Sequence, residues 1–128
     1  MNVTVVLLSH SAAVARGVAD LAGQMAPSAT VVPVGGTPDG RLGTDADALE
    51  SAVREAVSSG AEVALLVDLG SAVLTAKTVL ADLDDEPVVL VDAPFLEGAV
   101  AAVVTASTGA GLAEVVAQAE LARDLRKT

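Results

Sequence analysis

The feature that most constrains the fold of this chain is a regular alternation between short apolar runs and longer segments of helical spacing. The four runs cover residues 3–8, 31–34, 63–67 and 88–91, and they are rich in β-branched residues. Nearly continuous apolar runs of this length are typical of parallel strands that are covered on both faces. Pro33 has no N–H to donate to a sheet ladder, so we expect the second strand to lie at an edge of the sheet.

Between the runs, apolar residues recur every three or four positions, as they do on one face of a helix. The recurring residues are Val14, Val18, Leu21, Ala22 and Met25, then Leu49, Ala52, Val53, Ala56 and Val57, then Val73, Ala76, Leu80 and Leu83. Right-handed crossovers between parallel strands place such helices on both faces of a sheet. The sequence therefore predicts an α/β fold, a small three-layer open sandwich with a central, mainly parallel four-stranded sheet. With 128 residues, we expect one domain covering 1–128.

The last third of the chain differs, because two helical segments follow the fourth run and no convincing fifth strand does. Residues 98–107 are apolar on nearly every side, and an apolar stripe runs from Leu112 to Leu125. A helix that is apolar all round is usually buried on two sides. Two interpretations stay open: the helices pack closely within one monomer, or the second side of 98–107 is buried against another copy in a homodimer.

Charge and composition exclude several functional classes. The chain has 17 Asp and Glu against 7 Lys and Arg, a formal net charge of -10, which opposes binding to nucleic acid or to an anionic membrane. It has no cysteine and one histidine, so a disulfide framework and a zinc site are not expected. No apolar run approaches the ~18–20 residues of a membrane-spanning helix. We expect a cytoplasmic protein that needs neither a metal nor an organic cofactor.

The candidate chemistry lies where the first and third strands end. In open parallel sheets, ligands bind outside the carboxyl ends of the strands. Ser9-His10-Ser11 follows the first strand, and Asp68-Leu69-Gly70-Ser71 follows the third. A neutral imidazole, with an ordinary pKa of ~6.5, has a lone pair that can attack a phosphoryl group. Asp68 would accept a hydrogen bond from the other ring nitrogen and fix the tautomer.

A phosphoryl group also needs donors that carry no negative charge, and hydroxyl and peptide N–H groups at the start of a helix meet this need. The candidate phosphoryl-binding residues are Ser9, Ser11, Gly70, Ser71 and Thr44. Ser11 and Thr44, or its neighbour Asp45, are also ordinary N-caps, which alone would explain them. His10 could likewise be a structural histidine.

Four short motifs together resemble one family. They are Ser9-His10-Ser11, Gly43-Thr44-Asp45-Ala46, Asp68-Leu69-Gly70-Ser71-Ala72 and Ala93-Pro94-Phe95-Leu96-Glu97-Gly98. In this order and spacing they resemble the phosphotransferase subunits of phosphoenolpyruvate-dependent dihydroxyacetone kinases. That family belongs to the mannose-type IIA group of the bacterial phosphotransferase system (PTS), and the resemblance covers essentially the whole chain.

The resemblance implies a homodimeric phosphoryl carrier. His10 matches the histidine that accepts a phosphoryl group from the histidine-containing phosphocarrier protein, and Asp68 matches the carboxylate beside it. Gly70 and Ser71 match the turn at the phosphoryl site. The group would pass to ADP bound in the nucleotide-binding subunit of the kinase. Because the chain stops at Thr128, without the fused phosphocarrier domain of some relatives, we expect separate donor proteins.

Two alternatives accompany this hypothesis. The compact turn Asp68-Leu69-Gly70-Ser71-Ala72 favours the kinase subunit over the IIA component of a mannose-family sugar transporter, which is the first alternative. The second belongs to another class: a non-catalytic dimeric binding or regulatory module in which His10 senses pH or a ligand. Loss of relay activity on replacement of His10 would separate the carriers from the module.

Overall fold

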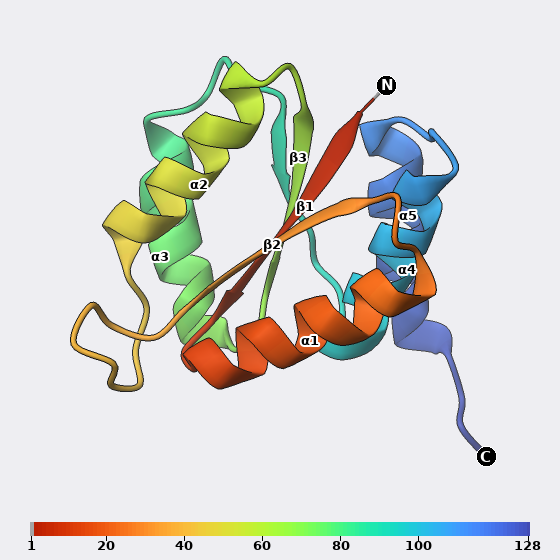
Figure 1. Cartoon of the computed structure of the whole chain (residues 1–128), viewed down its shortest axis with the longest axis horizontal. Coiled ribbons are helices and arrows are strands. Elements are labelled where there is room, and N and C mark those ends of the chain that lie inside the picture. The colour runs from red at the N-terminus through yellow and green to blue at the C-terminus, as the bar shows by residue number, and fades with distance from the viewer. Residues whose placement is uncertain (1) are drawn as a thin grey trace.

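The computed structural model describes residues 2–128 and contains one parallel sheet of strand order β2-β1-β3-β4 (Figure 1). The strands are β1 (Val3–Ser9), β2 (Thr30–Gly35), β3 (Glu62–Val67) and β4 (Val88–Leu90). Every neighbouring pair is parallel. β2 lies at an edge, as the proline at position 33 predicted, and the four expected strands are confirmed.

Across residues 2–128, five helices cover the two faces of the sheet (Figure 1). They are α1 (Ala12–Met25), α2 (Ala46–Ser58), α3 (Gly70–Ala81), α4 (Phe95–Ser107) and α5 (Leu112–Leu121), and a short 3-10 turn (Ala122–Asp124) follows. Within residues 2–128 no fifth strand follows β4, as predicted. None of the helices in that range is long and apolar enough to cross a membrane.

β1 is buried along its whole length because each of its faces packs against a different helical layer. Val5 and Leu7 belong to the apolar cluster with α1, α4 and α5. Val6 and Leu8 belong to the cluster with α2 and α3. This two-sided burial explains why the strand is continuously apolar and does not alternate with polar residues. The predicted three-layer α/β sandwich is confirmed.

The buried face of α1 differs from the predicted one. Its buried residues are alanines at positions 15, 19 and 22, whereas Val14, Leu21 and Met25 are exposed. Alanine lets the helix approach the sheet closely, and the end of β2 shows how little room there is. A Cβ on Gly35 would lie 2.6 Å from the carbonyl oxygen of Ser11. Of the predicted stripe, Ala22 is buried and Val18 packs against the core, whereas Val14, Leu21 and Met25 lie on the side away from it.

The predicted apolar faces of α2 and α3 agree better with the observed buried residues than that of α1 does. In α2 the expected Leu49, Val53 and Ala56 are buried. In α3 the buried residues are Ala72, Ala76 and Val79, so that stripe is rotated from the predicted one, although Leu83 after the helix is buried as expected.

The helix over residues 98–107 is covered on two sides by its own chain. Its residues Gly98, Ala99, Ala102 and Val103 are buried, and the last three belong to a cluster shared with α1, α5 and the sheet. A Cβ on Gly98 would lie 2.9 Å from the Cβ of Ala93, so the helix packs too closely there for any larger residue. Close packing within the monomer therefore accounts for the apolar residues on the buried side of this helix. Val104 remains 40% exposed, so the homodimer built on 98–107 stays a prediction.

Candidate active site

Two neighbouring parallel strands bring His10 and Asp68 together. Leu8 of β1 lies beside Val67 of β3 in the sheet, so the residues that follow them reach the same edge. The Asp68 N–H donates to the Leu8 carbonyl oxygen at 3.1 Å, which extends the ladder by one step. The predicted meeting of the first and third strand ends is therefore what the structure contains.

The Asp68 carboxylate is held by four donors. Its Oδ1 lies 2.9 Å from His10 Nδ1 and accepts from the Leu69 N–H at 2.7 Å. Its Oδ2 accepts from the Ser9 hydroxyl at 2.9 Å and from the His10 N–H at 3.0 Å. Ser9 is completely buried, so its hydroxyl supports the carboxylate from inside the protein and does not face solvent.

These donors determine the charge of Asp68. Burial acts to raise the pKa of this carboxyl, but hydrogen bonds from the His10 backbone, the Ser9 hydroxyl, the His10 ring and the Leu69 backbone lower it below the ordinary value. Asp68 is therefore ionised near neutral pH. An ionised carboxylate has no proton to donate, so in a neutral imidazole the proton sits on His10 Nδ1 and the lone pair on Nε2.

Ser71 covers that lone pair. Its Oγ lies 2.7 Å from His10 Nε2, and because Nε2 is the acceptor of the neutral ring, the serine hydroxyl donates. The His10 side chain retains 25% exposure, and Ser71 is exposed on the first turn of α3. Nε2 therefore faces solvent and an alcohol that can rotate away.

Ser11 and Gly70 begin the two helices beside this pair. The Ser11 hydroxyl caps α1 by accepting from the Val14 N–H at 3.2 Å, and the Ser11 N–H donates to Ser9 Oγ at 3.0 Å. Gly70 is the first residue of α3, and a Cβ on it would meet nothing within 4 Å. Open space at this position leaves the start of α3 accessible from outside.

Thr44 is placed differently from the other candidates. Its hydroxyl pairs with that of Thr75 on α3 at 2.7 Å, not with His10, and Asp45 is the residue that caps α2. The preceding Gly43 donates its N–H to the His10 carbonyl oxygen at 2.8 Å and has a φ of 147°. Gly43 was not singled out from the sequence as a site residue, although its place in Gly-Thr-Asp-Ala was the available signal.

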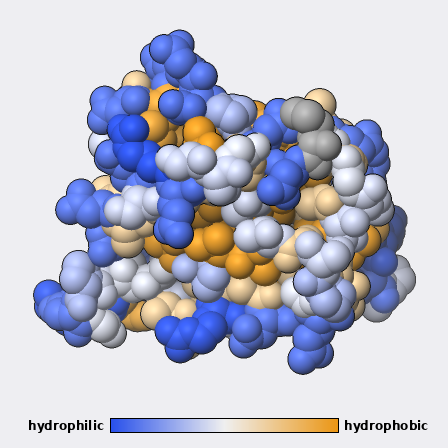
Figure 2. Space-filling model, turned by 45° about the horizontal axis from the view of Figure 1, so that its top comes forward, coloured by the Kyte–Doolittle hydropathy of each residue, from blue (hydrophilic) through white to orange (hydrophobic). Residues whose placement is uncertain are grey.

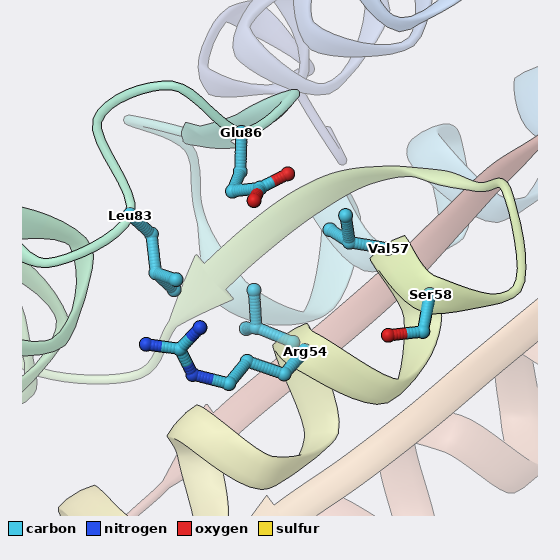
Figure 3. Close-up of a pocket in the computed structure, with 6 residues that line it drawn as sticks. Arg54, Val57, Ser58, Leu83 and Glu86 are labelled. Carbon is cyan, nitrogen blue, oxygen red and sulfur yellow. The ribbon is translucent and has the colours of Figure 1, made fainter.

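One cavity within residues 2–128 lies apart from His10. A cavity of about 110 Å³ lies between α2 and the segment before β4, at the amino ends of the strands (Figure 3). Figure 3 shows Leu83 and Glu86 across this cavity from Arg54, Val57 and Ser58. None of the candidate site residues lines it. In the same range, no three His, Asp or Glu side chains gather in a way that could hold a metal ion.

Comparisons with known proteins bear on the family and the fold of the chain. The family model described as PTS system fructose IIA component (EIIA-man) matches residues 4–116. A PEP-dependent dihydroxyacetone kinase 1 phosphoryl donor subunit, DhaM, of Listeria innocua is 39% identical over 97 residues, which are 76% of this chain and 76% of that protein. A crystal structure described as unknown function protein EF1359 has a TM-score of 0.84 and 35% identity, with 94% of both chains covered.

The relatives differ in length. The phosphoryl donor subunit DhaM of Escherichia coli is 36% identical and aligns with 98% of this chain, but the match spans only 28% of that longer relative. A phosphotransferase subunit DhaM of a PTS-dependent dihydroxyacetone kinase from Lactococcus lactis is 28% identical and aligned over 95% of its length. The chain therefore corresponds to the whole of some relatives and to about a quarter of others.

Proposed function

The chain belongs to the family of PTS system fructose IIA components, and from this membership and the geometry of His10 we propose that it is a phosphohistidine carrier. The observation that carries the proposal is the pair of contacts on one imidazole. Nδ1 lies 2.9 Å from an ionised carboxylate, while Nε2 lies 2.7 Å from a hydroxyl at the protein surface. A neutral ring held in this way has its nucleophilic nitrogen directed outward.

In the proposed transfer, the Nε2 lone pair attacks the phosphorus of a phosphohistidine on the donor protein. The Nε2–P bond forms while the donor's N–P bond breaks, and the leaving nitrogen keeps the electron pair. The His10 ring keeps its Nδ1 proton throughout, and Asp68 stabilises the positive charge that develops on the ring. In the second transfer, from His10 to ADP, an oxygen of the terminal ADP phosphate attacks the same phosphorus. The Nε2–P bond breaks, and its electron pair returns to Nε2.

Ser71 has a second role in this scheme. Its hydroxyl must leave Nε2 before transfer, and it can then donate to an oxygen of the bound phosphoryl group. The N–H groups of Gly70 and Ser71 lie in the first turn of α3, where the helix dipole favours an anion. The Ser11 hydroxyl at the start of α1 completes the proposed phosphoryl-binding set, whereas the Thr44 hydroxyl pairs with Thr75 and the buried Ser9 hydroxyl donates to Asp68.

The proposed partners follow from the relatives, which are named as phosphoryl donor subunits of dihydroxyacetone kinases. The donor is the histidine-containing phosphocarrier protein, and the acceptor is ADP in the nucleotide-binding subunit of the kinase. The protein thus acts in the cytoplasm as the phosphotransferase component of the kinase system.

We also propose a homodimer, for which a further surface is available besides 98–107. β4 is an edge strand of three residues, and a groove of about 480 Å³ beside it is lined by Val89 and by Leu112, Val116 and neighbours on α5. A second copy would cover this edge and its apolar border. A monomeric mass in sedimentation at micromolar concentration would contradict the dimer.

The test of the carrier is direct. The protein is incubated with phosphoenolpyruvate, enzyme I and the histidine phosphocarrier, and its intact mass and peptide map are recorded at alkaline pH, where phosphohistidine survives. We expect one phosphoryl group on His10 and none on His10→Gln, with both proteins folded. No phosphoryl group on the wild type, with donors shown to be active, would reject the carrier and favour a binding module.

The acceptor separates the two carrier hypotheses. The description of the family as fructose IIA components is the observation that favours a sugar-transport role as the second candidate. The phosphorylated protein is therefore mixed either with the ADP-loaded kinase subunit or with a IIB protein of a mannose-family transporter. We expect rapid discharge by the kinase subunit only. Discharge by IIB alone would assign the protein to transport.

A further inference from the structure

We propose that Leu42, Leu69 and Leu74 form an apolar collar around His10 Nε2 that docks the folded protein which delivers the phosphoryl group. This inference rests on the proposed function, because it concerns how the donor reaches the same nitrogen. The collar belongs to three separate parts of the chain: the loop before α2, the turn after β3, and α3.

Hydrogen bonds fix the collar's position relative to His10. Leu69 donates its N–H to the carboxylate that holds the imidazole, at 2.7 Å. Leu42 precedes Gly43, whose N–H donates to the His10 carbonyl oxygen at 2.8 Å. Leu74 lies three residues after Ser71 on α3, so its side chain shares a helix face with the hydroxyl that contacts Nε2.

The three leucines are unusually exposed for their size. Leu42, Leu69 and Leu74 are 80%, 60% and 70% exposed, and none of them belongs to either core cluster. Figure 2 shows that the face it presents also has a hydrophobic area framed by hydrophilic residues, so apolar surface on this molecule is not confined to one place. What distinguishes the collar is that each leucine is, or lies near in the chain, a residue that hydrogen-bonds to His10 or to the carboxylate beside it. Apolar residues gathered at such a place indicate an interaction site.

The charges around the collar suit a partner that carries a phosphoryl group. Asp39 and Arg41 of the loop pair with each other at 2.8 Å, and Lys77 lies one turn beyond Leu74 on α3. The acidic turn 82–86, by contrast, precedes β4 and so lies at the opposite end of the sheet. A chain of net charge -10 would repel a dianionic group, whereas the Asp39–Arg41 pair is neutral as a whole and Lys77 adds one positive charge on α3.

The spread of the collar favours a protein over a small phosphorylated metabolite. A small molecule that reaches Nε2 would contact the few atoms around His10 and gain little from leucines on three separate segments. A protein partner covers roughly 800 Å² on each side of an interface, enough to bury all three. Well-buried apolar side chains near the centre of such an interface supply a large share of its affinity.

The test compares the collar variant Leu42→Ala/Leu74→Ala with a control variant, Leu121→Ala/Leu125→Ala. The control changes two exposed leucines near the C-terminus that do not belong to the collar. Leu69 is left intact because its backbone supports Asp68. Two donors are used: the phosphorylated histidine phosphocarrier over a range of concentrations, and phosphoramidate, a small phosphoryl donor that needs no docking. For the collar variant we expect a KM for the protein donor raised about tenfold, a kcat within about twofold, and an unchanged phosphoramidate rate. The control variant should match the wild type with both donors.

Three results would overturn the collar. The first is an unchanged KM of the collar variant for the protein donor. The second is an equal loss of phosphorylation rate with both donors, which would mean that the leucines affect the chemical step. The third is a defect seen only in discharge of the phosphoryl group to the acceptor. Failure of the carrier hypothesis itself would look different, because the wild type would then gain no phosphoryl group on His10 from the protein donor.

Discussion

At the scale of single residues, the Asp68 carboxylate does more than balance a charge, because it selects which nitrogen of His10 can react. Each of its oxygens accepts two hydrogen bonds, so all four donors require an acceptor there. An asparagine offers one acceptor oxygen and one NH₂ group in the same space. Whichever way the amide is turned, its NH₂ group meets donors.

We therefore expect Asp68→Asn to slow phosphorylation of His10 by about 10²-fold or more. If the amide oxygen takes the place of Oδ2, the NH₂ group faces Nδ1, moves the ring proton to Nε2 and removes the reactive lone pair. Asp45→Asn is the matched control, since asparagine caps α2 as well as aspartate does. Rates are measured with phosphoramidate, so that docking plays no part. An equal effect of both substitutions would contradict this role of Asp68.

The same carboxylate makes stability depend on pH. Its pKa is lower in the folded protein than its ordinary value of about 3.9, because the donors outweigh burial. Its contribution is then fully present above the ordinary value and is lost as pH falls through the lower, folded-state value. We expect the difference in unfolding free energy between wild type and Asp68→Asn, from urea titrations, to shrink between pH 7 and about pH 3. Asp39 and Glu97 shift in the same direction but are present in both proteins. A constant difference would refute the contribution.

Residue types alone were enough to locate His10, Asp68 and Ser71, because the ends of parallel strands meet at one edge. They were not enough for Thr44, whose hydroxyl is used by Thr75. Nor did they reveal that Gly43 joins its loop to the His10 backbone, since that contact depends on a positive φ and on the path of a ten-residue loop. Local patterns predict such long-range hydrogen bonds poorly.

At the scale of elements, the predicted buried face of a helix was right or wrong according to how closely that helix packs against the sheet. Stripes built on large residues were right for α2, where Leu49 and Val53 fill the space against the sheet. In α1 they were wrong for Val14, Leu21 and Met25, which are exposed while alanines form the buried residues of the helix. Apolar periodicity gives weight to large side chains, so it misplaces the buried face of a helix that packs through methyl groups.

Close packing of α4 leads to a stability prediction. A Cβ at Gly98 would lie 2.9 Å from Ala93 Cβ and 3.2 Å from Leu66 Cδ2, so we expect Gly98→Ala to destabilise the protein by about 1–3 kcal/mol through overpacking. Gly17→Ala is the control, because Gly17 is exposed in α1 with nothing within 4 Å of a new Cβ. It should stabilise by about 0.5–1 kcal/mol through helix propensity. Urea unfolding of both variants measures the change in the free energy of unfolding for each. A stabilised Gly98→Ala would contradict the prediction, because it would show that α4 has space for a Cβ at this position.

At the scale of the whole molecule, charge and apolar surface have separate roles in the proposed transfer. The net charge of -10 acts over distance and steers a partner with basic flanks, whereas the collar acts only on contact. Sequence composition predicted the first role, because net charge does not depend on the fold. It could not predict the second, because the loop before α2, the turn after β3 and the start of α3 meet at His10 only in the folded chain.

Salt should separate the two roles. Raising NaCl from about 50 to 500 mM shortens the Debye length from about 14 to 4 Å and screens steering between exposed charges. We expect phosphorylation by the protein donor, at concentrations below KM, to slow severalfold in wild type and in Leu42→Ala/Leu74→Ala alike, because leucine contacts are not screened. Phosphoramidate is an anion that the acidic surface repels, so its rate should stay constant or rise over the same range. A protein-donor rate that is independent of salt would remove the steering role and leave docking to the collar alone.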